Sequence, residues 1–264
     1  MGNAPKQLSD VTLVVLGHGS TSAPDAATAV FAHADTIKKR HSFAAVHPAF
    51  LRQLPLARDV IEPLSGEIVI VPHLAADGYI AKDVVPRELD LDGGLTERQG
   101  KRIYYTEPVG THPGLADIAA AAIEDVLKHN ALTPDRTAVV VVGHGTERDP
   151  ASGEATRRLA DAIFGRHAVA ESVATLLEIS PLVDDWRTLT SATAVIILPF
   201  LFSAGFHGRD DIPARLGLPP IHAIDGPAAG PFEIADRTLY LCPPVGTLPA
   251  VADVIVARAQ QAIV

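Results

Sequence analysis

The sequence has few of the features that would tie it to several common protein classes. Cys242 is its one cysteine, which excludes an intrachain disulfide and zinc sites built on several cysteines. No apolar run is long enough to cross a bilayer, and the start, MGNAPKQLSDV, lacks the apolar run of a secretory signal. Positive charge is also scarce: 22 Lys and Arg stand against 31 Asp and Glu, a net charge of −9. We therefore expect a cytoplasmic protein with neither membrane nor nucleic acid as a partner.

What the sequence does contain is ample material for a packed core, together with many histidines. Hydrophobic residues make up 47% of the 264 positions and charged residues 20%, which is typical of a folded chain. The length suits two domains of average size. Because 11 histidines are many for this length, the question becomes which of them converge.

The chain contains two copies of one unit. VTLVVLGHGS in the first half matches TAVVVVGHGT in the second, which pairs His18 with His144. Later, RIYYTEPVGTHPGLAD matches TLYLCPPVGTLPAVAD. A unit of about 120 residues is far longer than a solenoid repeat, so each copy is expected to form its own lobe. We place the N-terminal lobe at 1–130 and the C-terminal lobe at 131–264, with 131–136 as the linker.

Short apolar runs alternate with amphipathic stretches in each copy. In the second copy the pattern predicts strands at 138–142, 173–177, 195–198 and 238–241, and helices at 154–166, 182–189, 210–216 and 249–263. The stretch 217–236, rich in Pro and Gly, is predicted to be an irregular insertion. Alternating strands and helices indicate a parallel sheet. The expected fold class is α/β: two similar lobes, each a small parallel sheet flanked by helices, with a cleft between them.

Three polar residues of the second copy follow predicted strands. His144 comes directly after the first strand, Glu178 ends the second, and His207 lies in the loop after the third. Ligands of parallel sheets bind beyond the carboxyl ends of the strands, and imidazole and carboxylate groups suit a divalent cation and proton transfer. Each residue also has a structural alternative: loop packing for His144, a solvated charge or an arginine partner for Glu178, and a helix cap for His207.

The first copy serves as an internal control for these three residues. It keeps His18, but it has Arg52 at the position of Glu178 and Ile80 at the position of His207. Neither arginine nor isoleucine is a metal ligand. We therefore expect one metal site, in the C-terminal lobe, with the N-terminal lobe as the opposite wall of the cleft.

Three segments of the second copy, VVGHGT, LLEISP and LPFLFSAGFHGRDDIP, resemble class II chelatases of the sirohydrochlorin cobaltochelatase and ferrochelatase (CbiX-like) family in its long, two-lobe form. The resemblance covers essentially the whole chain. It implies insertion of a divalent metal, Co²⁺, Fe²⁺ or Ni²⁺, into sirohydrochlorin or a related tetrapyrrole in cobalamin or siroheme biosynthesis. It also implies that no ATP is needed and that a monomer suffices.

The resemblance assigns the metal-binding and catalytic roles to His144, Glu178 and His207. Further residues are expected to bind the macrocycle: Gly143, Gly145, Thr146, His18, Gly205, Phe206 and Arg52. Backbone amides of glycine loops can bind carboxylates without net positive charge. For Arg52, a surface or interlobe salt bridge is the alternative.

Other functions stay open or are disfavoured by what the sequence lacks. A non-catalytic metal- or tetrapyrrole-binding protein of the same fold would use the same three residues. A hydrolase or phosphoryl-transfer enzyme is disfavoured, because there is no P-loop, no G-x-S-x-G elbow and no RHG signature. A related protein that acts on another tetrapyrrole is not excluded, and the sequence does not select among the three metals.

Overall fold

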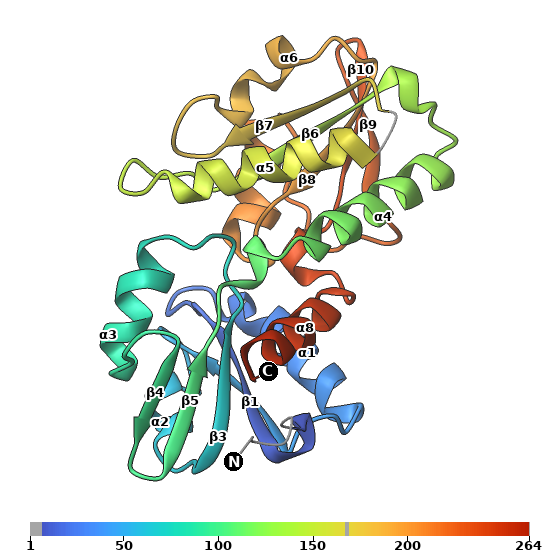
Figure 1. Cartoon of the computed structure of the whole chain (residues 1–264). Helices are drawn as coiled ribbons and strands as arrows, with labels where there is room; N and C mark the ends of the chain where they lie inside the picture. The colour runs from blue at the N-terminus through green and yellow to red at the C-terminus, as the bar shows by residue number, and fades with distance from the viewer. Residues whose placement is uncertain (1–6, 167–168, 264) are drawn as a thin grey trace. The chain divides into compact units, whose positions relative to one another are not determined.

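The computed structural model describes residues 7–166 and 169–263 (Figure 1). The segment MGNAPK, on which the expected absence of a secretory signal partly rests, lies outside these ranges. Within them, no helix combines the length and apolar character needed to cross a bilayer. The described residues form two five-stranded sheets flanked by helices, which confirms the predicted α/β class with two similar lobes.

The first sheet has the strand order β2-β1-β3-β5-β4. Its strands are β1 (Val11–Gly17), β2 (Ala45–Phe50), β3 (Gly66–Pro72), β4 (Leu95–Arg98) and β5 (Lys101–Tyr105). The helical segments of this copy are η1 (Leu8–Asp10), η2 (Pro24–Ala27), α1 (Thr28–Lys39), α2 (Ala57–Ile61), η3 (Ile80–Val84), α3 (Val85–Leu89), η4 (Val109–Thr111) and α4 (Gly114–His129). All pairings are parallel except that of β4 with β5.

The second sheet repeats this order as β7-β6-β8-β10-β9. Its strands are β6 (Thr137–Gly143), β7 (Glu171–Leu176), β8 (Ala194–Pro199), β9 (Ala229–Ile234) and β10 (Arg237–Leu241). The helical segments are η5 (Pro134–Arg136), α5 (Ala151–Arg166), η6 (Val183–Asp185), α6 (Trp186–Leu189), η7 (His207–Asp211), α7 (Ile212–Arg215), η8 (Val245–Thr247) and α8 (Val251–Ile263). The predicted strands and helices of this copy are therefore present, with ends that differ by a few residues.

One prediction about the second sheet is wrong. The stretch 217–236 is not irregular throughout, because it contains β9, which pairs antiparallel with β10 at the edge of the sheet. Gly230 and Pro231 interrupt the apolar alternation of this strand, and Pro is tolerated in edge strands. Each sheet is thus mostly parallel with one antiparallel edge strand, rather than wholly parallel.

The chain forms two compact units, and the last helix of each sequence copy belongs to the unit of the other copy. The first unit runs to His112 and resumes at Pro249, and the second is Pro113–Leu248. The helix that ends each copy in the sequence, α4 or α8, therefore belongs to the unit built on the other copy's sheet. The chain changes units at the matched segments VGTHP and VGTLP. The division of the sequence into copies at 1–130 and 131–264 stays a prediction. The expected linker, 131–136, lies inside the second unit.

Contacts within the first unit hold α8 there. The helix packs against α1 and β3. Arg258, buried in α8, donates a hydrogen bond to the Thr111 hydroxyl at 2.7 Å and forms an ion pair with Glu107 at 3.1 Å. These contacts join the helix to the segment at which the chain leaves the unit.

The core of the second unit explains why its first strand is so apolar. All seven residues of β6 are buried, because the strand is central in its sheet and both faces are covered. α5 packs against β6 and β7 (Figure 1). Val140 and Val142 pack instead with Trp186 and Ile212 in one apolar cluster. The strand ends are thereby fixed in place for the residues that follow them.

Candidate active site

The parallel pairing of β6 and β7 brings His144 and Glu178 to the same edge of the sheet. Gly143, the last residue of β6, is in register with Leu176, the last residue of β7. Beyond the strands, the backbone N–H of Glu178 donates to the carbonyl oxygen of His144 at 3.1 Å. The placement predicted from strand ends is therefore what the structure shows for these two residues.

The two glycines beside His144 are required by protein packing. Gly145 has a φ of +69°, and a Cβ atom there would lie 2.9 Å from the Cβ of Leu176. A Cβ atom on Gly143 would lie 2.0 Å from the hydroxyl of Thr156 on α5. Both positions therefore exclude a side chain without reference to a ligand. This geometry accounts for the glycines of the GHG motif, which the sequence argument had assigned to macrocycle binding.

A hydrogen bond to the backbone determines which nitrogen of the His144 ring carries the hydrogen. Its Nδ1 lies 2.8 Å from the carbonyl oxygen of Gly145, and because a carbonyl only accepts, Nδ1 is the donor. In the neutral ring the lone pair is then on Nε2, which lies 3.6 Å from Oε1 of Glu178. A cation bonded to two such atoms at about 2.1 Å in tetrahedral geometry separates them by about 3.4 Å. The pair is thus spaced to share a divalent ion.

His207 joins this pair through its ring. It is the first residue of the π-helical segment η7, and its ring centroid lies 5.0 Å from that of His144, with the rings at 89°. Its Nδ1 donates to Oδ2 of Asp211 at 2.8 Å. The Nε2 lone pair is therefore available in this histidine as well.

Asp211 connects His207 to two further charged residues. Arg215 donates from Nε to Oδ1 of Asp211 and from Nη1 to Oδ2 of Asp184, each at 2.9 Å. Burial raises the pKa of Asp211, but the hydrogen bonds from Arg215 and His207 outweigh that effect and hold the pKa below its usual range. Sequence reasoning missed this network. The four-residue spacings of His207, Asp211 and Arg215 in one helical segment are the signal that could have revealed it.

The three predicted ligands are accessible to a metal ion. The side chains of His144, Glu178 and His207 are 43%, 51% and 41% exposed. Among the residues that the structure describes, no group of three or more His, Cys, Asp or Glu side chains is placed so that it could hold a metal ion.

A model of the CbiX family matches residues 12–126 and 138–262, which are the two copies of the repeat. The chain belongs to the CbiX family. A protein of Halobacterium salinarum named probable sirohydrochlorin cobaltochelatase is 32% identical over 95% of this chain and 91% of its own length.

Solved structures share the fold of this CbiX-family chain. DR2241 of Deinococcus radiodurans, a multi-domain protein with structural similarity to chelatases, has a TM-score of 0.74 and 25% identity over 95% of this chain and 54% of its own. CbiX of denitrifying bacteria has a TM-score of 0.70 and 24% identity, covering 96% of this chain and 100% of its own. SirB of Bacillus subtilis, solved with Fe³⁺, has a TM-score of 0.71 and 19% identity, covering 96% and 95%.

Other residues expected to bind the macrocycle surround the CbiX-family site in the second unit. Phe206 is 58% exposed, and its ring centroid lies 5.7 Å from that of His207. The carbonyl oxygen of Gly205 accepts the N–H of Gly208 within the turn that leads into η7. The Thr146 hydroxyl accepts a backbone N–H two residues further on. Of these three residues, Phe206 is the one that presents an exposed aromatic ring.

The first copy keeps part of the same geometry. Nδ1 of His18 lies 2.8 Å from the carbonyl oxygen of Gly19, as Nδ1 of His144 does from that of Gly145. Arg52, however, forms an ion pair with Glu88 at 2.6 Å, which is the salt-bridge alternative expected for it, here within one unit. Ile80 packs against the apolar core of that unit. The second ligand set that the repeat could have supplied is therefore absent from the first copy.

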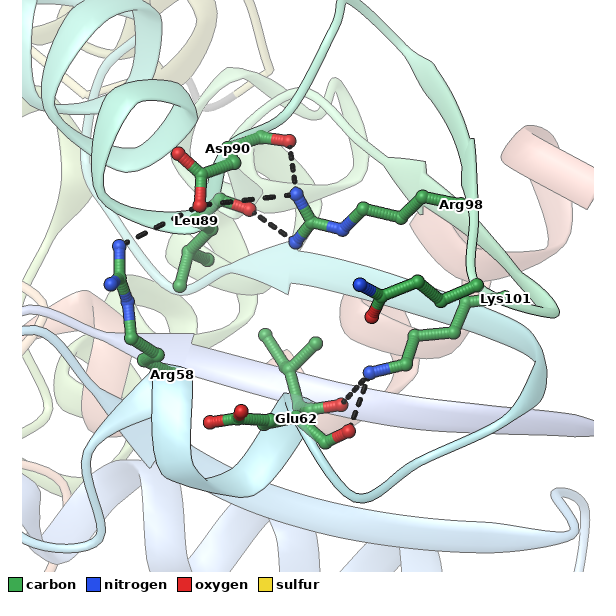
Figure 2. Close-up of a pocket in the computed structure, with 8 residues that line it drawn as sticks. Arg58, Glu62, Leu89, Asp90, Arg98 and Lys101 are labelled. Atoms are coloured by element: carbon green, nitrogen blue, oxygen red, sulfur yellow. Dashed lines mark hydrogen bonds and ion pairs between the residues drawn. The ribbon is translucent and has the colours of Figure 1, made fainter.

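A pocket of the first unit is lined by several cations, but these cap helices (Figure 2). Lys101 donates to two carbonyl oxygens at the end of α2, and Arg98 donates to two at the end of α3. Arg237, the counterpart of Lys101 in the second copy, donates to the carbonyl of Thr190 at the end of α6. Since the cap recurs in both copies, it is a feature of the scaffold.

Proposed function

We propose that this chain inserts a divalent metal ion into sirohydrochlorin or a related metal-free tetrapyrrole, without ATP, at His144, Glu178 and His207. The observation that carries the proposal is the 3.6 Å separation of Nε2 of His144 from the Glu178 carboxylate, with the His207 ring against that of His144. The name of the Halobacterium relative supports the reaction class and favours Co²⁺ as the metal. Fe²⁺ and Ni²⁺ also suit a His and Glu site.

The reaction exchanges one metal ion for two protons. The macrocycle loses the hydrogens of two pyrrole N–H groups, and four ring nitrogens bind the incoming ion. The two histidines have Nε2 lone pairs with which to hold the ion, and they can accept the protons once the ion has left. Glu178 offsets the charge of the ion beside them. In this proposal the same residues bind the metal ion before insertion and accept the two protons that the macrocycle loses.

The macrocycle must also be bound and bent, because a pyrrole lone pair in a flat ring points toward the centre of the ring. A site that fits the bent shape better than the flat one lowers the barrier to insertion. Phe206 supplies an apolar contact beside His207 in this proposal. Thr146 offers a hydroxyl group to substrate carboxylates, whereas Gly143, Gly145 and Gly205 are buried and the N–H of Gly145 already donates to Ser152. In this proposal the active form is a cytoplasmic monomer.

The proposal is tested by incubating the purified protein with sirohydrochlorin and Co²⁺, Fe²⁺ or Ni²⁺ in turn, without ATP, and following the absorbance of the macrocycle. We expect the protein to accelerate insertion of at least one metal over the reaction without protein. Metal binding without any acceleration would favour the alternative, a metal- or tetrapyrrole-binding protein with no turnover.

A further inference from the structure

The two copies exchange charge at a pair of equivalent positions. Glu178 corresponds to Arg52, and Arg215 corresponds to Glu88, because the helical segments η7 and α7 match η3 and α3 residue by residue. In the first unit this pair is joined: Nη2 of Arg52 donates to Oε1 of Glu88 at 2.6 Å. The scaffold therefore allows side chains at these two positions to meet.

In the second unit the arginine of the pair is held by other residues. Arg215 donates to Asp211 and to Asp184, both at 2.9 Å, while the ion-pair contact of Glu178 is with His144. Asp211 is the more buried of the two acids, with 17% of its side chain exposed against 48% for Asp184. Two carboxylates from separate segments thus fix the position of one guanidinium.

The first unit lacks both of these restraints. Val84 stands at the position of Asp211, and Arg58 stands at the position of Asp184. Arg58 donates to the backbone carbonyl of Glu88 at 2.7 Å, which leaves the Glu88 carboxylate to Arg52. The first unit, which lacks the two acids, has the arginine–glutamate ion pair. The second unit has both acids, and there the glutamate of the pair, Glu178, is a candidate metal ligand.

An arginine bound to Glu178 would compete directly with a metal ion. A guanidinium donates to the same carboxylate oxygens that a divalent cation would bind, and charge-assisted bonds of this kind are among the stronger hydrogen bonds. Each unit has one arginine and one glutamate at these two positions, but the two residue types are interchanged between the units. The combined length of the two side chains is therefore the same in both units. Reach alone therefore does not keep them apart.

We propose that Asp211 and Asp184 are positioning residues that hold Arg215 away from Glu178 and so leave this carboxylate free for the metal ion. The inference rests on the proposed role of Glu178 as a ligand. If Asp211 only oriented His207, its loss would weaken metal binding through His207. In this proposal the loss of Asp211 weakens metal binding because Arg215 is freed to bind Glu178. Removal of that arginine should then repair the damage.

The test measures the affinity of the full chain for Co²⁺ alone, by titration of the visible absorption of the bound ion. We expect Asp211→Ala to weaken binding by about ten-fold or more, the size usual for residues that position metal ligands. Arg215→Ala should bind like the wild type, and the double variant Asp211→Ala/Arg215→Ala should recover most of the lost affinity. A double variant as weak as Asp211→Ala would overturn the proposal, as would unchanged binding by Asp211→Ala.

Two further variants guard the test against a folding defect. Asp184→Asn removes one restraint on Arg215 without changing a contact of His207. We expect this variant to weaken Co²⁺ binding less than Asp211→Ala does, and the addition of Arg215→Ala to restore the affinity. If Asp211→Ala does not fold, unchanged Co²⁺ binding by Asp184→Asn would count against the proposal. Asp117→Ala, which removes another arginine-paired acid of the second unit, should leave binding unchanged. Because the readout is metal binding, failure of the rescue is distinguishable from failure of the insertion reaction, which is measured with the macrocycle.

Discussion

His144 and Glu178 form a pair in which the imidazole Nε2 lies 3.6 Å from a carboxylate oxygen and the backbone of the second residue hydrogen-bonds to that of the first. The side-chain spacing suits a shared cation, and the backbone contact keeps the two residues at one edge of the sheet. The proposed metal-binding role of this edge depends on this pair more than on any other contact.

Replacement of His144 by Ala should slow Co²⁺ insertion into sirohydrochlorin by about 100-fold, since the variant loses a metal seat and a base together. The matched control is His129→Ala, an exposed histidine of α4 in the same unit, which should keep the wild-type rate. Initial rates from the macrocycle absorbance distinguish the two variants. Equal rates for both would remove His144 from the mechanism.

Gly145→Ala should destabilise the protein by about 1–3 kcal/mol, because the positive φ is strained for any other residue and the new Cβ meets Leu176. Gly165→Ala is the control: this glycine lies in α5 with open space around it, so the substitution should be neutral or stabilising. Urea unfolding of the three proteins measures the difference. A Gly145→Ala variant as stable as the wild type would show that the turn relaxes around a side chain.

Cys242 predicts a loss of stability at alkaline pH. Burial raises the pKa of its thiol to about 12, whereas the pKa of an unfolded cysteine is about 8.5. Between these values the unfolded chain binds fewer protons than the folded chain, so the free energy of unfolding falls as pH rises. Unfolding from pH 8 to 10.5 should show a steeper decline for the wild type than for Cys242→Ala. Parallel curves would contradict the assigned burial of the thiol.

The sequence predicts the central strands and their ends well for a physical reason. A strand covered on both faces, such as β6, is a continuous apolar run, and the carboxyl ends of parallel strands meet at one edge. Since this edge could be located from pattern alone, the grouping of His144, Glu178 and His207 could be anticipated. Their roles in catalysis stay predictions.

Three features could not be read from the pattern. β9 is broken by Gly230 and Pro231, so its alternation is lost. The exchange of α4 and α8 depends on which sheet each helix packs against. The repeat in the sequence would be the same if each helix packed on the sheet of its own copy. The contact of Arg215 with Asp184 joins two segments that are far apart in the sequence, which the four-residue spacings around Asp211 do not reveal.

The most direct test of the account compares the initial rates of Co²⁺ insertion by the wild type, Glu178→Gln and Ile80→Val. Glutamine keeps the shape of Glu178 but removes its charge, and Ile80 occupies the position of His207 in the first copy, where no metal site is proposed. The account predicts a loss of about 100-fold for Glu178→Gln, with Ile80→Val at the wild-type rate. A Glu178→Gln variant that inserts Co²⁺ as fast as the wild type would contradict it.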